Sequence, residues 1–207
     1  MKRVVYFDLD GTLVDSLPDI TDSVNFVLNS YGMIKLDEAT VRGMVGNGTR
    51  DLIQAALAER SDLTDQALAL FMEHYGENYM NRAKVYPFVI DTLAKIKARK
   101  VVVTNKPESI TGKLLIKSGI IKVVDRYISP ETYNTKKPDP TGIFSDLKEN
   151  GFNLSDAVLV GDSIVDIKTG QNADIKTIAV SYGYSDKKEY SMASIVIDSI
   201  DKLLQYI

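Results

Sequence analysis

The feature that most constrains the fold is an alternation of short apolar runs with helix-like segments, which begins after Pro87. The runs are rich in Val and Ile, as expected of strands that are covered on both faces. Counting the similar run near the start of the chain, strands are predicted at 4–7, 101–103, 123–128, 157–160, 177–180 and 195–197. Helices are predicted at 90–98, 109–118, 142–149, after 160 through 167, and 201–206. This order predicts an α/β fold in which a Rossmann-like parallel sheet carries helices on both faces.

A block of helices without a strand signal separates the first strand from this alternation, between about residues 19 and 82. Apolar side chains recur at helical spacing in the segments 20–31, 52–57 and 65–80, and Gly32 provides a stop for the first of them. We therefore expect an α-helical domain at 16–82. It is inserted into a core domain that consists of residues 1–15 and 83–207.

Composition excludes several classes of function. The chain has 25 basic and 28 acidic residues, mixed along its length, so no basic stretch offers a surface for nucleic acid. The absence of cysteine excludes disulfides, thiolate metal sites and a thiol nucleophile. No apolar run has the length of a signal-peptide core or a membrane span. The expectation is a cytoplasmic protein without a nucleic-acid or membrane partner.

Polar side chains follow three of the predicted strands at the point where each strand ends. The carboxyl ends of parallel strands lie at one edge of a sheet, and the binding sites of α/β proteins form there. A basic pair, Lys136-Lys137, falls in the loop after the third strand. We expect four loops to converge at this edge. Their candidate site residues are Asp8, Asp10, Thr104, Asn105, Lys137, Asp162 and Asp166.

The two carboxylates of Asp8 and Asp10 indicate a bound cation. Residues i and i+2 leave an extended chain on the same side, so these two side chains would lie close together. Such a pair is unfavourable unless a cation lies between the carboxylates or one of them holds a proton. Together with Asp162 they offer hard oxygen ligands with no His or Cys nearby. This donor set predicts Mg²⁺ rather than zinc as the cofactor.

The segment 8–13, Asp-Leu-Asp-Gly-Thr-Leu, resembles the first motif of the haloacid dehalogenase-like (HAD) superfamily. Three further motifs of the family follow in order. Segment 101–106 (Val-Val-Val-Thr-Asn-Lys) is similar to the second, 137–140 (Lys-Pro-Asp-Pro) to the third and 161–166 (Gly-Asp-Ser-Ile-Val-Asp) to the fourth. Agreement of four motifs is more specific than any single one. The resemblance implies the HAD core with a helical cap domain at 16–82.

The resemblance also implies roles in catalysis. Asp8 would be the nucleophile that forms an aspartyl-phosphate. Asp10 would protonate the leaving group and then activate water. Thr104 would donate a hydrogen bond to one phosphoryl oxygen, and the Lys137 ammonium would neutralise another.

A metal site and a substrate site are implied in the same way. The metal ligands would be Asp8, Asp10 through its backbone carbonyl, Asp162 and, directly or through water, Asp166. The substrate-binding residues would be Gly11, Asn105, Gly48 and Arg50. Gly11 lets the backbone turn closely around the phosphate, and the loop 46–50 faces the substrate in the caps of the family. His74, the one histidine of the sequence, is expected to have no catalytic role.

A helical cap directly after the first motif is similar to the branch that contains phosphoglycolate phosphatases and β-phosphoglucomutases. Segments 42–57, 104–106 and 180–184 look closest to the phosphatases. The chain departs from the branch at 87–89 and at Asp174, where glycine is usual, and at 129–131, which replaces a glycine-rich turn. The resemblance implies a phosphoric monoester hydrolase that acts on a small phosphorylated metabolite as a monomer or homodimer.

Several activities stay open at this point. A phosphomutase and an inorganic pyrophosphatase would share the core residues with a phosphatase. A catalytically silent phosphate-binding or regulatory protein could keep the fold, but it is disfavoured because the chain retains both Asp8 and Asp10. A haloacid dehalogenase is disfavoured because it has no acid at the position of Asp10.

Overall fold

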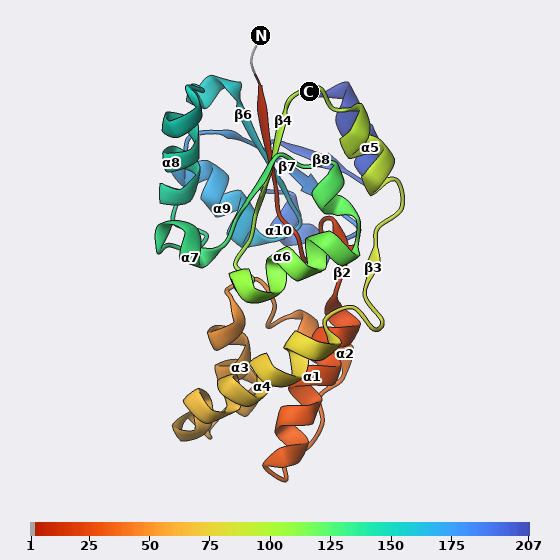
Figure 1. Ribbon diagram of the computed structural model, residues 1–207, viewed down its shortest axis with the longest axis vertical. Coiled ribbons are helices and arrows are strands. Elements are labelled where there is room, and N and C mark those ends of the chain that lie inside the picture. Colours follow the sequence, from red (N-terminus) through yellow and green to blue (C-terminus); the bar gives the residue numbers. More distant parts are fainter. Residues whose placement is uncertain (1–2) are drawn as a thin grey trace.

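The computed structural model describes residues 3–207 and shows a sheet with helices on both faces, next to a separate group of helices (Figure 1). Six strands form one sheet in the order β5-β4-β1-β6-β7-β8, and each neighbouring pair is parallel. The strands are β1 (Val4–Phe7), β4 (Arg99–Val103), β5 (Arg126–Ile128), β6 (Ala157–Gly161), β7 (Lys176–Val180) and β8 (Ile195–Ile197). The predicted α/β fold is confirmed.

Strand β1 lies in the middle of the sheet and sets the level at which its neighbours end. All four of its residues are buried. Phe7 pairs with Val102 of β4 on one side and with Val160 of β6 on the other. The backbone N–H of Asp8 then donates to the Val160 carbonyl at 2.8 Å. The residues that follow these three strands therefore meet at one edge.

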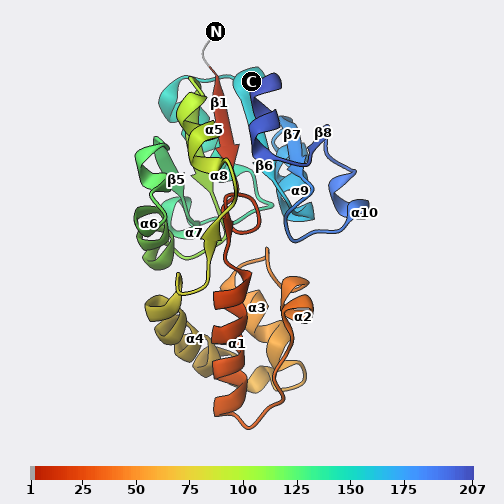
Figure 2. The same cartoon turned by 90° about the vertical axis from the view of Figure 1, so that its right-hand side faces the viewer.

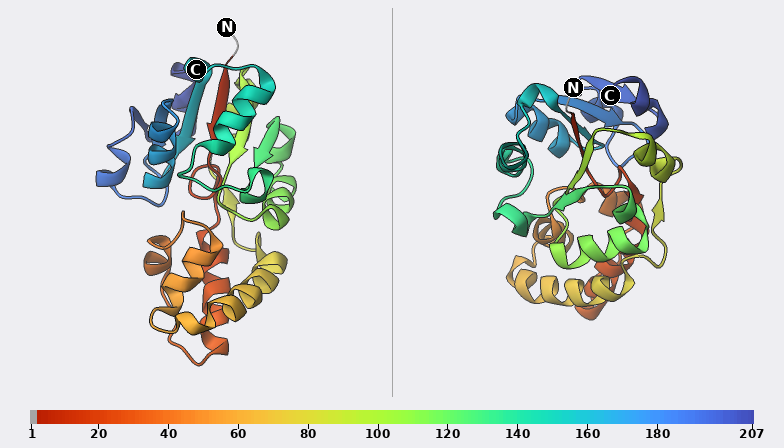
Figure 3. Two further views of the ribbon diagram at one scale, coloured as in Figure 1. Left: turned by 90° about the vertical axis from the view of Figure 1, so that its left-hand side faces the viewer. Right: turned by 45° about the horizontal axis from the view of Figure 1, so that its top comes forward.

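The helices of the core cover both faces of the sheet, as Figures 2 and 3 show. They are α5 (Val89–Lys95), α6 (Glu108–Lys117), α7 (Pro130–Tyr133), α8 (Thr141–Asn150), α9 (Ile164–Asn172) and α10 (Lys187–Tyr190). Val5 and Phe7 of β1 belong to an apolar cluster that includes side chains of α5 and α6. Val4 and Tyr6 belong to another, with side chains of α8. The alternation of side chains along β1 thus supplies both layers of the core.

Four helices of the inserted segment enclose an apolar cluster of their own. They are α1 (Leu17–Ser30), α2 (Glu38–Arg42), α3 (Thr49–Leu57) and α4 (Thr64–Asn78), with a 3₁₀ turn at Ser61–Leu63. Val24 and Leu28 of α1, Ile53 of α3 and Phe71 of α4 are buried together in this cluster. The apolar side chains whose helical spacing predicts three of these helices are the ones that pack the helices together. This spacing does not predict α2, which has five residues and is too short to show a period.

Two short strands connect these helices to the sheet. Strands β2 (Val14–Asp15) and β3 (Lys84–Val85) pair antiparallel where the chain leaves the core and where it returns. Asp19, buried in the first turn of α1, accepts hydrogen bonds from the backbone N–H groups of Arg82 and Ala83, each at 2.8 Å. The returning segment is therefore tied to the start of α1. We propose residues 16–82 as the cap, the division expected from the sequence.

The remaining elements differ from the predicted ones in detail. Strand β5 begins at Arg126 rather than at 123, because Gly119, with a φ of 77°, follows α6 and a 3₁₀ turn occupies Ile120–Lys122. A further 3₁₀ turn, Leu154–Asp156, precedes β6, and the last predicted helix is a 3₁₀ helix at Ile200–Gln205. Within residues 3–207 the longest helix, α4, has 15 residues, and no helix combines the length and the apolar character that crossing a membrane requires.

Candidate active site

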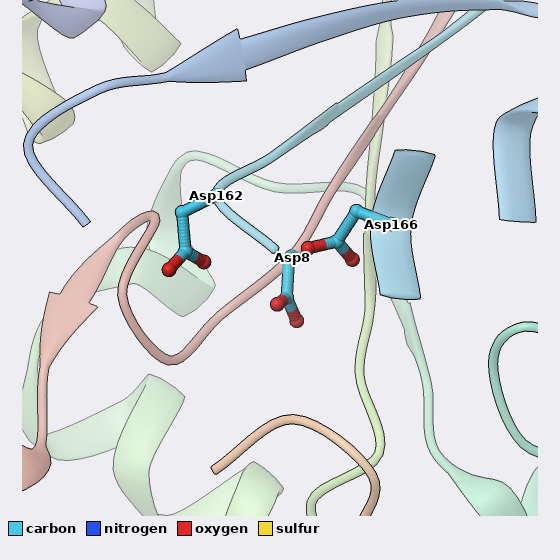
Figure 4. A group of neighbouring side chains, drawn as sticks. All are labelled: Asp8, Asp162 and Asp166. Atoms are coloured by element: carbon cyan, nitrogen blue, oxygen red, sulfur yellow. The ribbon is translucent and has the colours of Figure 1, made fainter. Parts of the chain in front are cut away.

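The carboxyl edge of the sheet faces the cap, and candidate site residues meet there. Asp8 follows β1, Thr104 follows β4 and Asp162 follows β6. Figure 4 shows Asp8 between Asp162 and Asp166. One carboxylate oxygen of each of these three residues lies within 4.8 Å of the other two, and all three side chains are buried. The structure therefore brings Asp8, near the start of the chain, together with Asp162 and Asp166 from a segment far along the sequence.

Lys137 lies in the same cluster and contacts two of its carboxylates. Its Nζ is 2.7 Å from Oδ1 of Asp8 and 2.6 Å from Oδ1 of Asp166. Asp166 is held from its other side by Ser163, whose backbone N–H and hydroxyl donate to Oδ2 at 3.0 and 2.6 Å in the capping box that opens α9. Burial would lower the pKa of Lys137, but the charges of Asp166 and Asp8 outweigh this effect and raise it. Lys137 is thus a fixed, buried cation next to Asp8.

Burial and repulsion raise the pKa of two of the carboxyl groups. The pKa of Asp8 lies well above its usual range, first because of burial and then because of the charge of Asp166, while Lys137 opposes both. The same two causes raise the pKa of Asp162 to about 7, although the backbone N–H of Tyr184 donates to its carboxylate at 2.6 Å. Three acidic groups around one lysine thus concentrate more negative charge than a buried site stabilises on its own.

This cluster fits a divalent cation such as Mg²⁺. It offers carboxylate oxygens, the ligands that Mg²⁺ prefers in proteins. Two glycines let the backbone approach Asp162 closely: a Cβ at Gly11 would lie 2.4 Å from Oδ2 of Asp162, and one at Gly183 would lie 2.2 Å from its Cβ. Gly11 also has a φ of 83°, which favours glycine. Asp8, Asp162 and Asp166 are the residues that could hold the ion.

Asp10 lies beside a second buried lysine, Lys106. The Lys106 Nζ is 3.0 Å from Oδ2 of Asp10 and donates to Oη of Tyr75, in α4, at 2.8 Å. The other carboxylate oxygen of Asp10 accepts a hydrogen bond from the Ser16 hydroxyl. Burial would lower the pKa of Lys106, but the charge of Asp10 and the contact with Tyr75 outweigh it and raise the pKa. The acid–base candidate is thus fixed by a lysine that also touches the cap.

Asn105 holds two loops in place. Its Nδ2 donates to the carbonyls of Gly46 and Lys137, each at 2.9 Å, and its Oδ1 accepts from the Lys137 N–H at 2.8 Å. The side-chain amide of Asn105 thus contacts backbone atoms of both loops and positions Lys137, while the residue also lines the cleft. Thr104 is different. Its Oγ1 accepts from the Lys106 N–H at 3.2 Å, which leaves the hydroxyl hydrogen to donate into the cleft that Thr104 lines.

A cleft of about 550 Å³ opens between the sheet edge and the cap. Asp8 and Asp10 line its core side, and Gly48 belongs to the cap loop that lines the other side. Arg50, which was expected to reach the substrate, is not among the residues that line this cleft. Its guanidinium forms an ion pair with Asp65 of α4 at 2.8 Å, and both side chains are more than half exposed. In this arrangement the Arg50 side chain pairs with a carboxylate on the cap surface rather than lining the cleft.

Arg42, in the cap helix α2, places a positively charged side chain along the cleft. Its guanidinium donates to the backbone carbonyls of Gly183 and, at 2.8 Å, Tyr184. Sequence reasoning does not single out Arg42, because the helix that carries it has no readable period. His74 lies outside the cleft, where its ring stacks on Phe26 at 4.1 Å between centroids.

A parallel sheet with a buried aspartate–lysine contact at its carboxyl edge, beneath a helical cap, places the protein in one class of enzyme: the chain belongs to the haloacid dehalogenase-like hydrolase family. The model of that family matches residues 5–180. Within the family, the chain is a phosphoglycolate phosphatase-like hydrolase, as the helical cap and segments 42–57, 104–106 and 180–184 implied.

Individual relatives support this assignment along nearly the whole chain. The sequence is 37% identical to phosphoglycolate phosphatase 1 of Pseudomonas aeruginosa, covering 99% of this chain and 79% of that protein. It is 35% identical to the phosphoglycolate phosphatase of Psychrobacter arcticus, covering 89% and 85%. A solved structure described as a predicted phosphoglycolate phosphatase from Haemophilus somnus superposes with a TM-score of 0.93 at 28% identity, covering 99% and 97%. A haloacid dehalogenase-like hydrolase from Streptococcus pneumoniae, at 20% identity, shares the fold with a TM-score of 0.90 over 99% and 98%.

Proposed function

We propose that the protein is a Mg²⁺-dependent phosphatase that hydrolyses a small phosphomonoester, with phosphoglycolate as the leading candidate, through an aspartyl-phosphate on Asp8. The observation that carries the proposal is the buried contact of 2.7 Å between Asp8 and Lys137, which pairs a nucleophile with a cation for the phosphoryl group. Relatives named phosphoglycolate phosphatase support the substrate and favour hydrolysis over the phosphomutase and pyrophosphatase alternatives. A small metabolite of this kind also fits the cytoplasmic location expected from the sequence.

In the first half of the reaction, a carboxylate oxygen of Asp8 attacks phosphorus and the bond between phosphorus and the ester oxygen breaks. Lys137 neutralises one phosphoryl oxygen, and the Thr104 hydroxyl donates a hydrogen bond to another. Asp10 gives a proton to the departing alkoxide oxygen. Mg²⁺, when bound beside Asp8 and Asp162, supplies positive charge that offsets the repulsion between carboxylate and phosphate.

In the second half, Asp10 is ionised and acts as a base. It takes a proton from a water molecule, whose oxygen attacks phosphorus while the bond to Asp8 breaks. Inorganic phosphate is released, and both Asp8 and the protonated Asp10 are restored. The hydrogen bond from Ser16 and the ion pair with Lys106 keep the Asp10 carboxylate in one orientation for both steps.

The cap side of the cleft supports a small substrate. Ile20, Leu52 and Phe71 line part of it, beside polar residues that include Arg42 and Tyr75, and belong to the apolar cluster of the cap. The apolar part of this side gives no partner to the hydroxyl groups of a sugar, and polar groups buried without partners reduce binding. A short organic phosphate leaves fewer such groups against this apolar part.

The proposal is tested by phosphate release from phosphoglycolate, sugar phosphates, nucleotides and diphosphate with Mg²⁺ present. We expect release from phosphoglycolate to be fastest, to stop in excess EDTA and to return when Mg²⁺ is restored. Asp8→Asn should lower kcat by at least about 10⁴-fold with an unchanged circular dichroism spectrum, because a covalent nucleophile is lost. Undiminished turnover in EDTA or by Asp8→Asn would contradict the mechanism. A preference for diphosphate or a sugar phosphate would contradict the substrate.

A further inference from the structure

We propose that Lys106 and Tyr75 form a carboxylate-binding subsite beside Asp10, which selects phosphomonoesters whose carboxylate is one carbon away from the ester oxygen. The inference rests on the proposed function and deepens it. The mechanism above uses Lys106 only as a partner of Asp10. The position of its ammonium group, however, provides more than that contact requires.

Lys106 has a hydrogen-bond donor to spare inside the cleft. Its side chain is 4% exposed and lines the cavity. An ammonium group has three N–H donors. Two are directed to Oδ2 of Asp10 at 3.0 Å and to Oη of Tyr75 at 2.8 Å, and residues 3–207 provide no acceptor for the third. A buried donor without a partner is unfavourable, so an anionic group of the substrate would be bound where it accepts this hydrogen bond.

Tyr75 provides a second donor next to the first. Its hydroxyl oxygen accepts from Lys106, and burial raises its pKa to about 12, although Lys106 opposes this, so the hydroxyl keeps its proton. In the described chain this hydroxyl hydrogen has no acceptor. The lysine N–H and the tyrosine O–H therefore offer two donors side by side, an arrangement that suits the two oxygens of one carboxylate.

The other cations near the cleft are already engaged. Lys137 lies between Asp8 and Asp166 at 2.7 and 2.6 Å, where the phosphoryl group is expected. Arg42 donates to two backbone carbonyls at the mouth of the cleft. Among the described residues that line the cleft, Lys106 is therefore the buried cation that remains for a second anionic group of the substrate.

The distance between Asp10 and Lys106 limits how many carbons can separate the carboxylate of the substrate from its ester oxygen. Asp10 must lie one hydrogen bond from the ester oxygen that it protonates, and Lys106 lies one contact beyond it, at 3.0 Å. In phosphoglycolate a single carbon separates the carboxylate from the ester oxygen, which places the carboxylate oxygens about 3 Å from that oxygen, on the scale of one hydrogen bond. A longer acid would carry its charge past Lys106 toward the apolar ring of Phe71, whose centroid is 5.2 Å from that of Tyr75.

The test compares phosphoglycolate with two analogues: 2-hydroxyethyl phosphate, which replaces the carboxylate by a hydroxymethyl group, and the phosphate ester of 3-hydroxypropanoate, which adds one carbon. The readout is the ratio of kcat/KM for phosphoglycolate to kcat/KM for each analogue. Lys106→Gln should lower the ratio to the hydroxyethyl ester by about 100-fold, and Tyr75→Phe should lower it by about tenfold. The wild type should also prefer phosphoglycolate to the longer acid. A fall in activity that is equal for all three esters would overturn the subsite, because it would show that Lys106 only positions Asp10.

Binding without turnover gives an independent readout. In the Asp8→Asn protein, calorimetry should show tighter binding of phosphoglycolate than of 2-hydroxyethyl phosphate, and adding Lys106→Gln should abolish the difference. An unchanged difference would refute the subsite. Lys136→Gln is a matched control: Lys136 also links core and cap, to Asp51 at 2.8 Å, but does not line the cleft, so its loss should affect all esters alike.

The two proposals fail in distinguishable ways. If the wild type released no phosphate from any monoester with Mg²⁺ present, the proposed function would fail whatever Lys106 does. If the wild type hydrolysed phosphoglycolate well and Lys106→Gln kept the wild-type ratios, only the subsite would fail. Tyr75→Phe keeps the ring and its packing, so it tests the subsite even if Lys106→Gln impairs folding.

Discussion

At the scale of single residues, Asp162 shows a conflict between stability and function. It is buried near two other carboxylates, and burial together with the charge of Asp166 raises its pKa from 3.8 to about 7. A carboxyl group with a raised pKa in the folded state stabilises the fold in its protonated form. This contribution is complete below about pH 3.8 and is lost as the pH rises through about 7. Without metal at pH 8, the ionised Asp162 should therefore destabilise the protein.

Replacing Asp162 by Asn should stabilise the metal-free protein while removing its response to Mg²⁺. Asn keeps the shape and an acceptor but removes the buried charge. In EDTA at pH 8 we expect the midpoint of thermal unfolding to rise by roughly 2–8 °C, which corresponds to a gain of about 1–2 kcal/mol in the free energy of unfolding. At pH 5 the gain should be smaller, because the wild-type carboxyl group is then mostly protonated. Added Mg²⁺ should stabilise the wild type but not the variant.

Asp139 provides a matched control for this prediction. It is exposed, and the hydrogen bonds of Thr141, whose N–H donates to it at 2.8 Å, lower its pKa. A lowered pKa means that the ionised form of Asp139 stabilises the folded state, the opposite of Asp162. Asp139→Asn should therefore not raise the midpoint of thermal unfolding at pH 8. A gain for Asp162→Asn that is the same at both pH values would show that lost charge is not its cause.

The site residues differ in how far the sequence reveals them. Asp8 and Asp162 could be placed together because each follows an apolar strand, and parallel strands end at one edge. The place of Lys137 in the site could be predicted because segment 137–140 resembles the third motif of the family. The positioning role of Asn105 could not be predicted, because it depends on where the Gly46 carbonyl of the cap comes to lie. Contacts between cap and core are set by tertiary packing and leave no local pattern.

At the scale of elements, whether the sequence predicts a helix or strand depends on its length and on the regular spacing of its apolar residues. Strand β1 is apolar throughout and buried, and α1 has a clear apolar face, so both elements can be predicted from the sequence. The paired strands β2 and β3 have two residues each and form because the chain crosses twice between core and cap. Helix α2 begins at the Asp37 cap, which accepts from the Thr40 N–H at 2.8 Å, a signal too common to predict a helix by itself.

The stability of the connection where the chain passes twice between core and cap should depend on Asp19. Asp19→Ala would leave the backbone N–H groups of Arg82 and Ala83 without their acceptor in a buried position. We expect the free energy of unfolding to fall by about 2–4 kcal/mol, which corresponds to a midpoint lower by roughly 4–16 °C. Asp22→Ala is the control, because Asp22 binds only the exposed guanidinium of Arg82, at 3.0 Å, and its loss should leave the midpoint nearly unchanged. Equal effects of the two variants would show that the backbone contacts do not matter.

At the scale of the whole molecule, the cap meets the core through a few polar contacts around the cleft. Asn105 reaches Gly46, Lys106 reaches Tyr75, and Arg42 reaches the loop that also contacts Asp162. From the core, Ile110 of α6 is buried in the apolar cluster of the cap, and Tyr184 packs against this cluster. Such an interface, with few apolar contacts, is suited to opening and closing around a substrate.

Lys136 and Asp51 should contribute to this closure as a pair. Lys136 Nζ lies 2.8 Å from Oδ2 of Asp51 in α3 and donates to the Asn47 carbonyl, in the loop that lines the cleft, at 2.9 Å. The pair is half exposed, so each single change, Lys136→Ala or Asp51→Ala, should raise KM by only about two- to fivefold with little change in kcat. The double variant should be no worse than the worse single one, because the same interaction is lost in all three.

The dependence on salt separates closure from a local effect on Lys137, the neighbour of Lys136 in the chain. Screening at high ionic strength should raise the wild-type KM toward that of the variants and leave the variants little changed. Asp198→Ala, which breaks a surface pair with Lys202 at 2.6 Å, should have the same KM as the wild type at each salt concentration. If the two single effects simply multiplied in the double variant, Lys136 and Asp51 would act independently, and their ion pair would make no contribution to closure of the cap.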